Sequence, residues 1–236
     1  MILSINKWTK KDRSIFLDYL KTFGESEKIP RPASVLNTKS PTLAIKTADI
    51  VKITKGIMEG NYTSFLDLGI DDYYESIAIY GLIISRMKDL DTFLHYLYKY
   101  LDYMNCWAHC DLMHFPDPFK HYETYFALSR KFRTDQRVMV RRLSLFILFH
   151  YRKEEEHLDF ILESLLDFQD DNEYYVIMMA GWLLCECIIY HQDRTLNFIE
   201  NNNINKKIQN KAIQKCRESR RFSQTQKDFL NKFKIK

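Results

Sequence analysis

Glycine and proline are scarce in this chain of 236 residues, which holds six glycines and five prolines. Both residues punctuate turns and strands, so their scarcity favours long helices with short connections. Long apolar runs are lacking too. The nearest, "VIMMAGWLLCECIIY", is interrupted by Glu186 and falls short of the roughly 18 apolar residues of a membrane span. The composition therefore predicts a helical protein that does not cross a membrane.

The sequence also lacks the marks of a secreted protein. Charges interrupt the N-terminal stretch "MILSINKWTKKDRS" too early for the apolar core of a signal peptide. The five cysteines are odd in number, so a disulfide framework is not expected. We therefore expect reduced cysteines and a cytoplasmic location.

A strong net charge is absent, because 35 basic residues stand against 31 acidic ones for a total of +4. The basic residues nevertheless gather in two places. The first is "SRKFRTDQRVMVRR", with Arg137, Arg141 and Arg142, and the second is the C-terminal stretch that contains Lys206, Lys207 and Lys211. Phosphate binding needs such local positive surfaces. A solvated helix face or a frayed tail is the ordinary alternative, and charge alone leaves both open.

Helical periodicity dominates what is present, as in the stripe of Leu94, Leu97 and Leu101, and no convincing alternating strand pattern occurs. About twelve helices of ordinary globular length are expected. They group loosely into pairs over residues 71–101, 119–152, 155–191 and 192–235. Two-helix units of this size build HEAT-like solenoids. A compact, irregular helical bundle is the alternative.

Several helix starts can be read from local patterns. Capping boxes are expected at Thr9 and Ser223, N-caps at Asp71, Asp89 and Asn172, and a helix that begins at Pro41.

One helix, "NEYYVIMMAGWLLCECIIYH", is apolar nearly all round and should be central and buried. Gly181 inside it indicates either close packing against another helix or the approach of a ligand or nucleic-acid backbone. Periodicity does not separate these two interpretations.

The segment "YMNCWAHCDLMH" places Trp107 and Asp111 four residues apart, on one face if the segment is helical. An ionised carboxylate in apolar surroundings is costly unless something pairs with it. Arg142, which opens the apolar run "LSLFILFHY", is one candidate partner. An ordinary structural Asp–Arg pair is the plainer interpretation.

The same segment contains Cys106, His109, Cys110 and His114, a combination that raises the question of a metal site. Structural zinc sites pair ligands across a short knuckle and bring the second pair from elsewhere, and one helix face does not easily close a tetrahedron. We favour buried thiols and partly exposed histidines, and expect no metal.

At these residues the sequence resembles the DNA alkylation repair family of HEAT-like-repeat DNA glycosylases. The matching features are Trp107-x-x-x-Asp111, Arg142 in "VRRLSLFILFHY" and Trp182 in "MMAGWLLCEC". Further likeness extends over roughly residues 40–221, and residues 1–37 match least. The order and spacing of the features are more specific than any one of them.

The resemblance implies an all-α HEAT-like helical-repeat solenoid, formed as a single domain over residues 1–236, with a concave groove for duplex DNA. It implies excision of cationic N-alkylated purines such as 7-methylguanine and 3-methyladenine by a monomer without a small-molecule cofactor. Asp111 would be the catalytic carboxylate and Trp107 and Trp182 the aromatic walls beside the lesion's deoxyribose. Arg142 would help hold the DNA backbone near the site. The two basic clusters add Arg137, Arg141, Lys206, Lys207 and Lys211 as expected further DNA contacts.

Two other hypotheses stay open. One is a HEAT-type protein that binds DNA structure without catalysis, and the other is a protein–protein scaffold, since many helical solenoids serve as one. Fold alone does not decide among the three.

Overall fold

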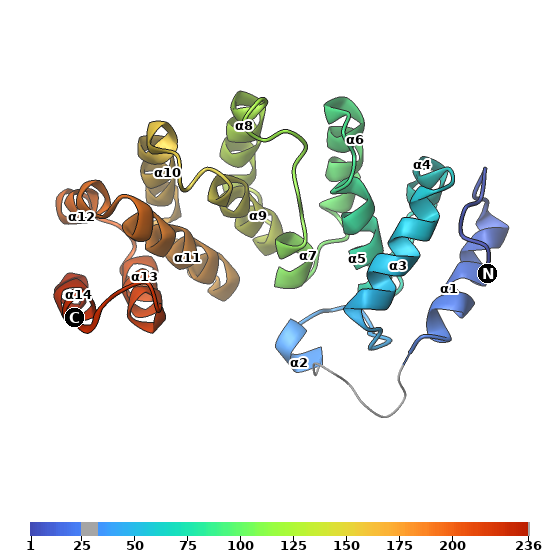
Figure 1. The fold of residues 1–236 in the computed structure, drawn as a ribbon, viewed down its shortest axis with the longest axis horizontal. Coiled ribbons are helices and arrows are strands. Elements are labelled where there is room, and N and C mark those ends of the chain that lie inside the picture. Colours follow the sequence, from blue (N-terminus) through green and yellow to red (C-terminus); the bar gives the residue numbers. More distant parts are fainter. Residues whose placement is uncertain (25–32, 236) are drawn as a thin grey trace. The chain divides into compact units, whose positions relative to one another are not determined.

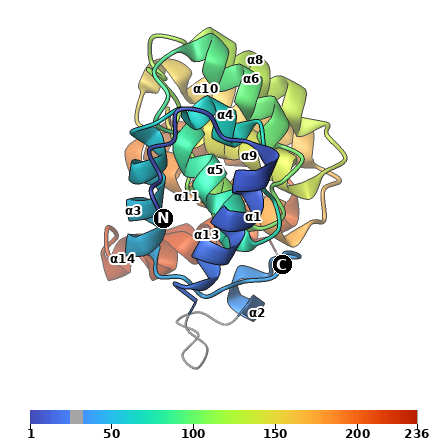
Figure 2. The ribbon, with the colours of Figure 1, turned by 90° about the vertical axis from the view of Figure 1, so that its right-hand side faces the viewer.

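The computed structural model describes residues 1–24 and 33–235, and over these residues the chain is helical without any strand (Figures 1 and 2). They form fourteen α-helices and three short 3-10 helices, slightly more than the sequence predicts. The all-α prediction is therefore confirmed, and the helix-on-helix packing is consistent with a helical-repeat solenoid. No helix of the described part is long and apolar enough to span a bilayer.

The chain divides into two compact units, Met1–Asp117 and Pro118–Lys236. The first unit contains the α-helices α1 (Lys10–Lys21), α2 (Ala33–Leu36), α3 (Thr47–Met58), α4 (Tyr62–Leu66), α5 (Tyr74–Ile84), α6 (Leu90–Tyr100) and α7 (Trp107–Asp111). The second contains α8 (Tyr122–Arg133), α9 (Val138–Phe149), α10 (Leu158–Ser164), α11 (Tyr174–Tyr190), α12 (Gln192–Asn201), α13 (Lys206–Glu218) and α14 (Gln224–Leu230), together with the 3-10 helices η1 (Glu155–His157), η2 (Leu165–Phe168) and η3 (Asn231–Phe233).

In the first unit α5 is the central helix, and α3, α6 and α7 all pack against it. Its start carries a buried carboxylate, Glu75, which accepts N–H groups of Leu43 and Ile45 in the preceding loop. The prediction of a helix from Pro41 is therefore wrong. Glu75 satisfies the backbone donors of residues 43–45 in an irregular loop, and α3 begins only at Thr47.

In the second unit α8 packs on α9, α9 on α11, and α11 on α13. The α11–α13 approach is very close, because a Cβ at Gly181 would lie 2.6 Å from Cγ of Lys211 and 3.3 Å from the backbone nitrogen of Ala212. Gly181 is thus explained by close helix packing, the first of its two interpretations. The prediction that α11 is central and buried is also confirmed.

Three of the helix starts that rest on local patterns agree with the structure. Ser223 and Gln226 form a capping box, Asp12 accepts the N–H of Thr9, and Asp89 caps α6. Two expected N-caps are wrong: Asp71 does not cap α5, whose N-cap is Tyr73, and Asn172 does not cap α11, whose N-cap is Glu173. The Asn172 side chain is used elsewhere, because its amide donates to the Asp170 carbonyl and its oxygen accepts from Lys207.

Candidate functional site

Helix α7 carries Trp107 at its first position and Asp111 at its last. Because the segment is helical, the two side chains leave the same face, where Cβ atoms four residues apart lie roughly 5–6 Å from each other. Both residues are partly exposed. The predicted juxtaposition of an indole and a carboxylate on one helix face is thus present in the structure.

A helix of five residues is not stable alone, so α7 depends on contacts from its neighbours. Cys106, His109 and Cys110 point into the core and are fully buried. The Tyr100 hydroxyl at the end of α6 donates to the His109 carbonyl over 3.0 Å. The face of α7 opposite Trp107 and Asp111 is therefore packed into the core, which anchors the helix that carries both residues.

The His109 ring is the main polar anchor of this wall. Its Nε2 lies 3.1 Å from the Tyr74 carbonyl, its Nδ1 lies 3.5 Å from the Asn105 nitrogen, and its ring stacks on Tyr74 at 4.9 Å. Both ring nitrogens are thus used within the protein. Burial lowers the pKa of His109 to about 4, so the ring is neutral at physiological pH and supplies no proton to a substrate.

No group of three or more possible metal ligands is assembled among residues 1–24 and 33–235. Cys106 and Cys110 are buried and His109 is bonded to backbone atoms, whereas His114 is exposed. The four residues that suggested a metal site in the sequence therefore face different surroundings.

Asp111 lies at the C-terminal end of α7, whose N-cap is Cys106, and the next α-helix begins at Tyr122. The C-terminal end of a helix carries a partial negative charge, which disfavours a carboxylate there. Asp111 therefore does not serve as an N-cap and gains nothing from the helix dipole.

Trp107 is held by a segment that the sequence pattern did not connect with it. Its indole Nε1 donates to the carbonyl of Val35, which lies in α2, over 3.0 Å. The last residues of the N-terminal stretch 1–37 thus take part in positioning one of the candidate site residues. No local sequence signal marks a hydrogen bond between residues so far apart.

In the second unit Trp182 lies midway along α11 and is partly exposed. Its ring packs against Phe149 at 4.3 Å, and the Lys215 ammonium lies 5.9 Å from the ring centre. Phe149 is covered in turn by the Arg152 guanidinium at 4.0 Å, which is paired with Glu186. Trp182 therefore belongs to an aromatic surface framed by cations.

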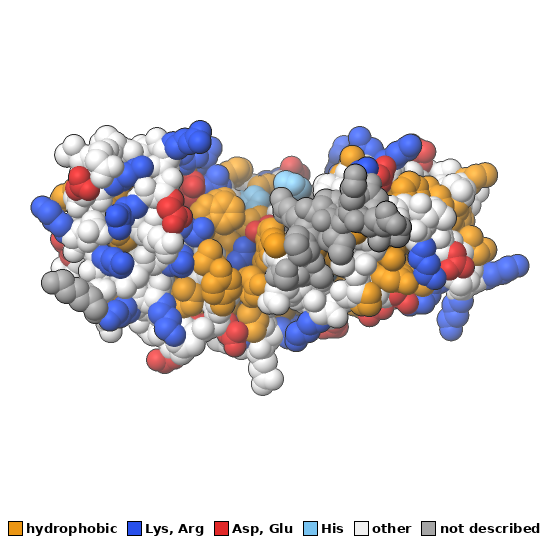
Figure 3. All heavy atoms as spheres, turned by 90° about the horizontal axis from the view of Figure 1, so that it is seen from below, with side chains coloured by type: hydrophobic (Ala, Val, Ile, Leu, Met, Phe, Trp, Pro, Cys, Tyr) orange, Lys and Arg blue, Asp and Glu red, His pale blue; other side chains and the backbone are white. Residues whose placement is uncertain are grey.

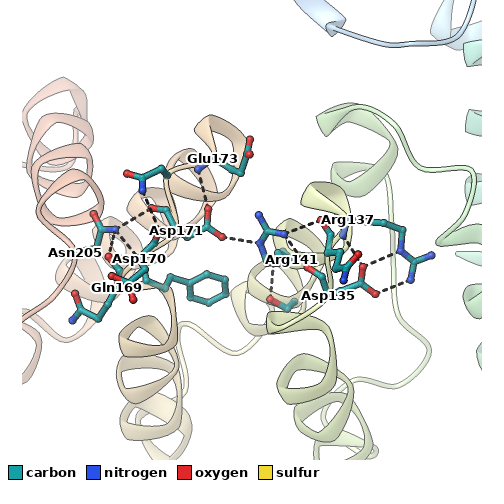
Figure 4. Close-up of polar contacts among 12 residues, drawn as sticks. Asp135, Arg137, Arg141, Gln169, Asp170, Asp171, Glu173 and Asn205 are labelled. Carbon is teal, nitrogen blue, oxygen red and sulfur yellow. Dashed lines mark hydrogen bonds and ion pairs between the residues drawn. The ribbon is translucent and has the colours of Figure 1, made fainter.

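The three candidate arginines of the first basic segment lie in different environments, and Figure 4 shows two of them, Arg137 and Arg141. Arg137 is 44% exposed and forms a fork with Asp135, at 2.9 and 2.7 Å, that lowers the pKa of this acid. Arg142 is 5% exposed, and its Nη1 donates to the Tyr175 carbonyl over 2.8 Å. The first guanidinium is accessible to solvent, and the second is held in place by the backbone of α11.

Arg141 forms a largely buried ion pair with Asp171 at 2.7 Å, with 16% and 9% of the two side chains exposed. It also donates to the backbone carbonyls of Asp135 and Gln136. Figure 4 shows that this pair joins α9 to the loop before α11. The sequence does not distinguish Arg141 from Arg142, whereas the structure gives them separate partners.

Asn205, the N-cap of α13, extends this polar network. Its amide lies within hydrogen-bond distance of the Phe168, Gln169 and Asp171 carbonyls, at 2.8–3.0 Å. The loop that holds Asp171 thereby also fixes the start of α13 (Figure 4). Sequence reasoning missed Asn205, because its partners lie more than thirty residues away.

The lysines Lys206, Lys207 and Lys211 all lie on α13, the first two exposed and the third half-buried. The structure therefore brings these three candidates together on one helix of the second unit. Trp182 and Arg142 belong to the same unit, and Trp107 and Asp111 to the first. A single site that joins both groups, and an ion pair between Asp111 and Arg142, stay predictions.

Each unit consists of helices packed on helices, which is the architecture of an all-helical repeat protein. One unit carries the face with Trp107 and Asp111, and the other carries the basic helix α13. A sequence model of the family described as "DNA alkylation repair enzyme" matches residues 16–219. The chain belongs to this family, as the resemblance predicts, and its membership assigns the chain to DNA repair, to an enzymatic role and to a DNA substrate. No curated protein matches the chain.

Proposed function

We propose that this protein is a DNA glycosylase that hydrolyses the N-glycosidic bond of cationic N-alkylated purines, such as 7-methylguanine and 3-methyladenine, in duplex DNA. The observation that carries the proposal is the face of α7. There, Asp111 and Trp107 are partly exposed, while Cys106, His109 and Cys110 anchor the helix from behind. The match to the DNA alkylation repair family supplies the class of substrate.

The chemistry of the lesion fits these two side chains. Alkylation at N7 of guanine or N3 of adenine leaves the base positively charged, so it departs without protonation. Breaking the bond builds positive charge on the sugar, as in other oxocarbenium-like reactions. A fixed carboxylate stabilises that charge and orients the attacking water. An indole face adds cation–π attraction of about 0.5–2 kcal/mol.

Each residue then has a defined role. Asp111 is the catalytic carboxylate, and Trp107 and Trp182 are the aromatic walls beside the deoxyribose. His109 supports α7 and takes no part in proton transfer, because its pKa of about 4 keeps it neutral. The cationic leaving group needs no general acid. This is compatible with a site in which His109, two residues before Asp111, does not act as an acid.

Arg137, Lys206 and Lys207 are exposed and are proposed to contact phosphates directly, as is Lys211, which lies half-buried on the same helix as the two lysines. Arg142 is preorganised, because one of its five N–H donors already binds the Tyr175 carbonyl. Arg141 has its charge balanced by Asp171, and we propose that it supports the DNA-binding surface through this ion pair.

The proposal is tested by incubating the protein with duplex DNA that carries 7-methylguanine and identifying the released base. Release of free 7-methylguanine, with an abasic site left in the strand, is expected. If the DNA is bound and no base is released, the non-catalytic DNA-binding hypothesis replaces the proposal. If the duplex is not bound even at low salt, the scaffold hypothesis takes its place.

A further inference from the structure

A groove of about 620 Å³ runs along α13 in the second unit. Its floor includes Ile177 and Ile213, and the remaining lining residues are Lys206, Lys207, Asn210, Lys211, Gln214, Arg217 and Lys234. These comprise five cations and two amides, without a carboxylate. Arg217 and Lys234 have no role in the function proposed above.

The cations follow the helix. Lys206, Asn210, Ile213 and Arg217 recur at helical spacing and form one stripe, which Lys207 and Lys211 adjoin. At 1.5 Å per residue, the stripe from Lys206 to Arg217 is roughly 16 Å long. Figure 3 shows Lys and Arg side chains gathered over the helices at the C-terminal end of the chain.

Three cations of this groove, Lys207, Lys211 and Arg217, have side-chain partners that do not neutralise their charge. The Lys207 ammonium donates to the amide oxygen of Asn172, and Lys211 donates to that of Gln214. Arg217 lies 3.4 Å from the amide oxygen of Asn231. These partners are neutral, in contrast to Asp135 and Asp171, which balance Arg137 and Arg141.

Lys234 comes from the C-terminal segment, which is docked onto α13 as far as residue 235. Asn210 donates to the Ile235 carbonyl over 2.9 Å and accepts the Ile235 N–H over 2.8 Å. Gln209 donates to the Phe233 carbonyl over 2.6 Å. These bonds flank Lys234 on both sides and place it in the wall of the groove, so the alternative of a frayed basic tail is wrong for these residues.

We propose that this groove binds the phosphodiester backbone of one DNA strand, with Arg217 and Lys234 as phosphate ligands and Asn210 as the residue that positions Lys234. A stripe of roughly 16 Å spans between four and five nucleotides at 3.4 Å per nucleotide along the duplex axis. Ammonium, guanidinium and amide N–H groups are the usual donors to phosphate oxygens. The proposal rests on the proposed function only in taking duplex DNA as the substrate.

The test measures affinity for a fluorescently labelled, undamaged duplex over a range of salt concentrations, using the full chain. Lys234→Gln and Arg217→Gln should each reduce the slope of log K against log salt by about one unit and weaken binding several-fold at ~0.1 M salt. Lys232→Gln is the matched control, because Lys232 lies on the same segment outside the groove. Its slope should equal that of the unaltered protein.

Asn210→Ala removes no charge but releases the segment that carries Lys234. It should reduce the salt slope as Lys234→Gln does, and adding Lys234→Gln to it should cause little further reduction. A merely structural Asn210 would instead lower the melting temperature and leave the slope unchanged.

Slopes for Lys234→Gln and Arg217→Gln that match the control overturn the proposal. Binding of a poly-glutamate peptide provides a second such test. If Lys234→Gln loses affinity for this peptide but keeps its affinity for the duplex, the groove binds a protein partner and the proposal is overturned. Base release with unchanged slopes refutes the groove and leaves the glycosylase standing. Reduced slopes without any base release refute the glycosylase and leave the groove standing.

Discussion

Asp111→Asn is the sharpest perturbation of the proposed chemistry, because it keeps the size of the side chain and removes its charge. Loss of a preorganised electrostatic group costs about 2.7–4 kcal/mol of transition-state stabilisation, or roughly a hundredfold to a thousandfold in rate. Asp111 is partly exposed, so solvent screens its field and the lower end of this range is expected. The measurement is single-turnover release of 7-methylguanine.

The stability of the same variant separates a catalytic carboxylate from a structural one. At the C-terminal end of α7, removing a negative charge relieves an unfavourable interaction with the helix dipole of about 0.3–1 kcal/mol. Asparagine also keeps one acceptor oxygen. The melting temperature should therefore change by no more than about 2–4 °C.

If Asp111 were chiefly the partner of a buried arginine, the substitution would cost about 3–5 kcal/mol and lower the melting temperature by roughly 6–20 °C. Excision per folded molecule would then stay near normal, and the catalytic reasoning would be refuted. Asp91→Asn is the matched control, because it makes the same charge change at an exposed position of the same unit. It should leave the rate unchanged and lower stability by no more than about 0.3–1 kcal/mol, because Asp91 lies in the first turn of α6.

Three further outcomes are expected from the packing. Because the folded His109 has a pKa of about 4 against 6.5 unperturbed, stability should fall as pH drops from about 6.5 toward 4, by about 3 kcal/mol from this group. His109→Gln should lose less stability over that pH window in urea titrations, and equal losses would contradict the buried neutral ring. A double-mutant cycle of Arg141→Met and Asp171→Asn should give a coupling of about 1–3 kcal/mol in denaturant unfolding, and additive effects would show that the buried pair contributes no coupling. Gly181→Ala should destabilise by about 1–3 kcal/mol despite alanine's better helix propensity, because its Cβ would meet Lys211. A raised melting temperature would show that α13 moves away from α11 at little cost in free energy.

Sequence reasoning succeeded where the deciding contacts are local. The shared face of Trp107 and Asp111 follows from helical spacing, and the capping box at Ser223 joins residues three apart. The all-helical fold follows from few glycines and prolines together with apolar stripes.

It failed where a distant group decided the local structure. The Glu75 carboxylate accepts backbone N–H groups of the loop after Pro41, although it lies more than thirty residues further along the chain. The loop therefore does not form the helix that Pro41 favours. Likewise, Val35 fixes the Trp107 indole and Asn205 fixes the Asp171 loop through contacts that no local pattern predicts. Arg141 and Arg142 are adjacent and chemically identical, and only their neighbours in space distinguish them.

The anchoring of α7 has a consequence for how the protein ceases to work. A five-residue helix that depends on Tyr74 and Tyr100 has no stability apart from α5 and α6. Its amide protons should therefore exchange with solvent together with those of its supports, in one cooperative opening of the first unit rather than by fraying. On heating, α7 and the face that carries Trp107 and Asp111 would unfold once this opening is well populated, even while the second unit is still folded. The useful lifetime of such an enzyme is thus set by the weakest supporting helix behind the site, and strengthening that support would lengthen it without touching a reacting group.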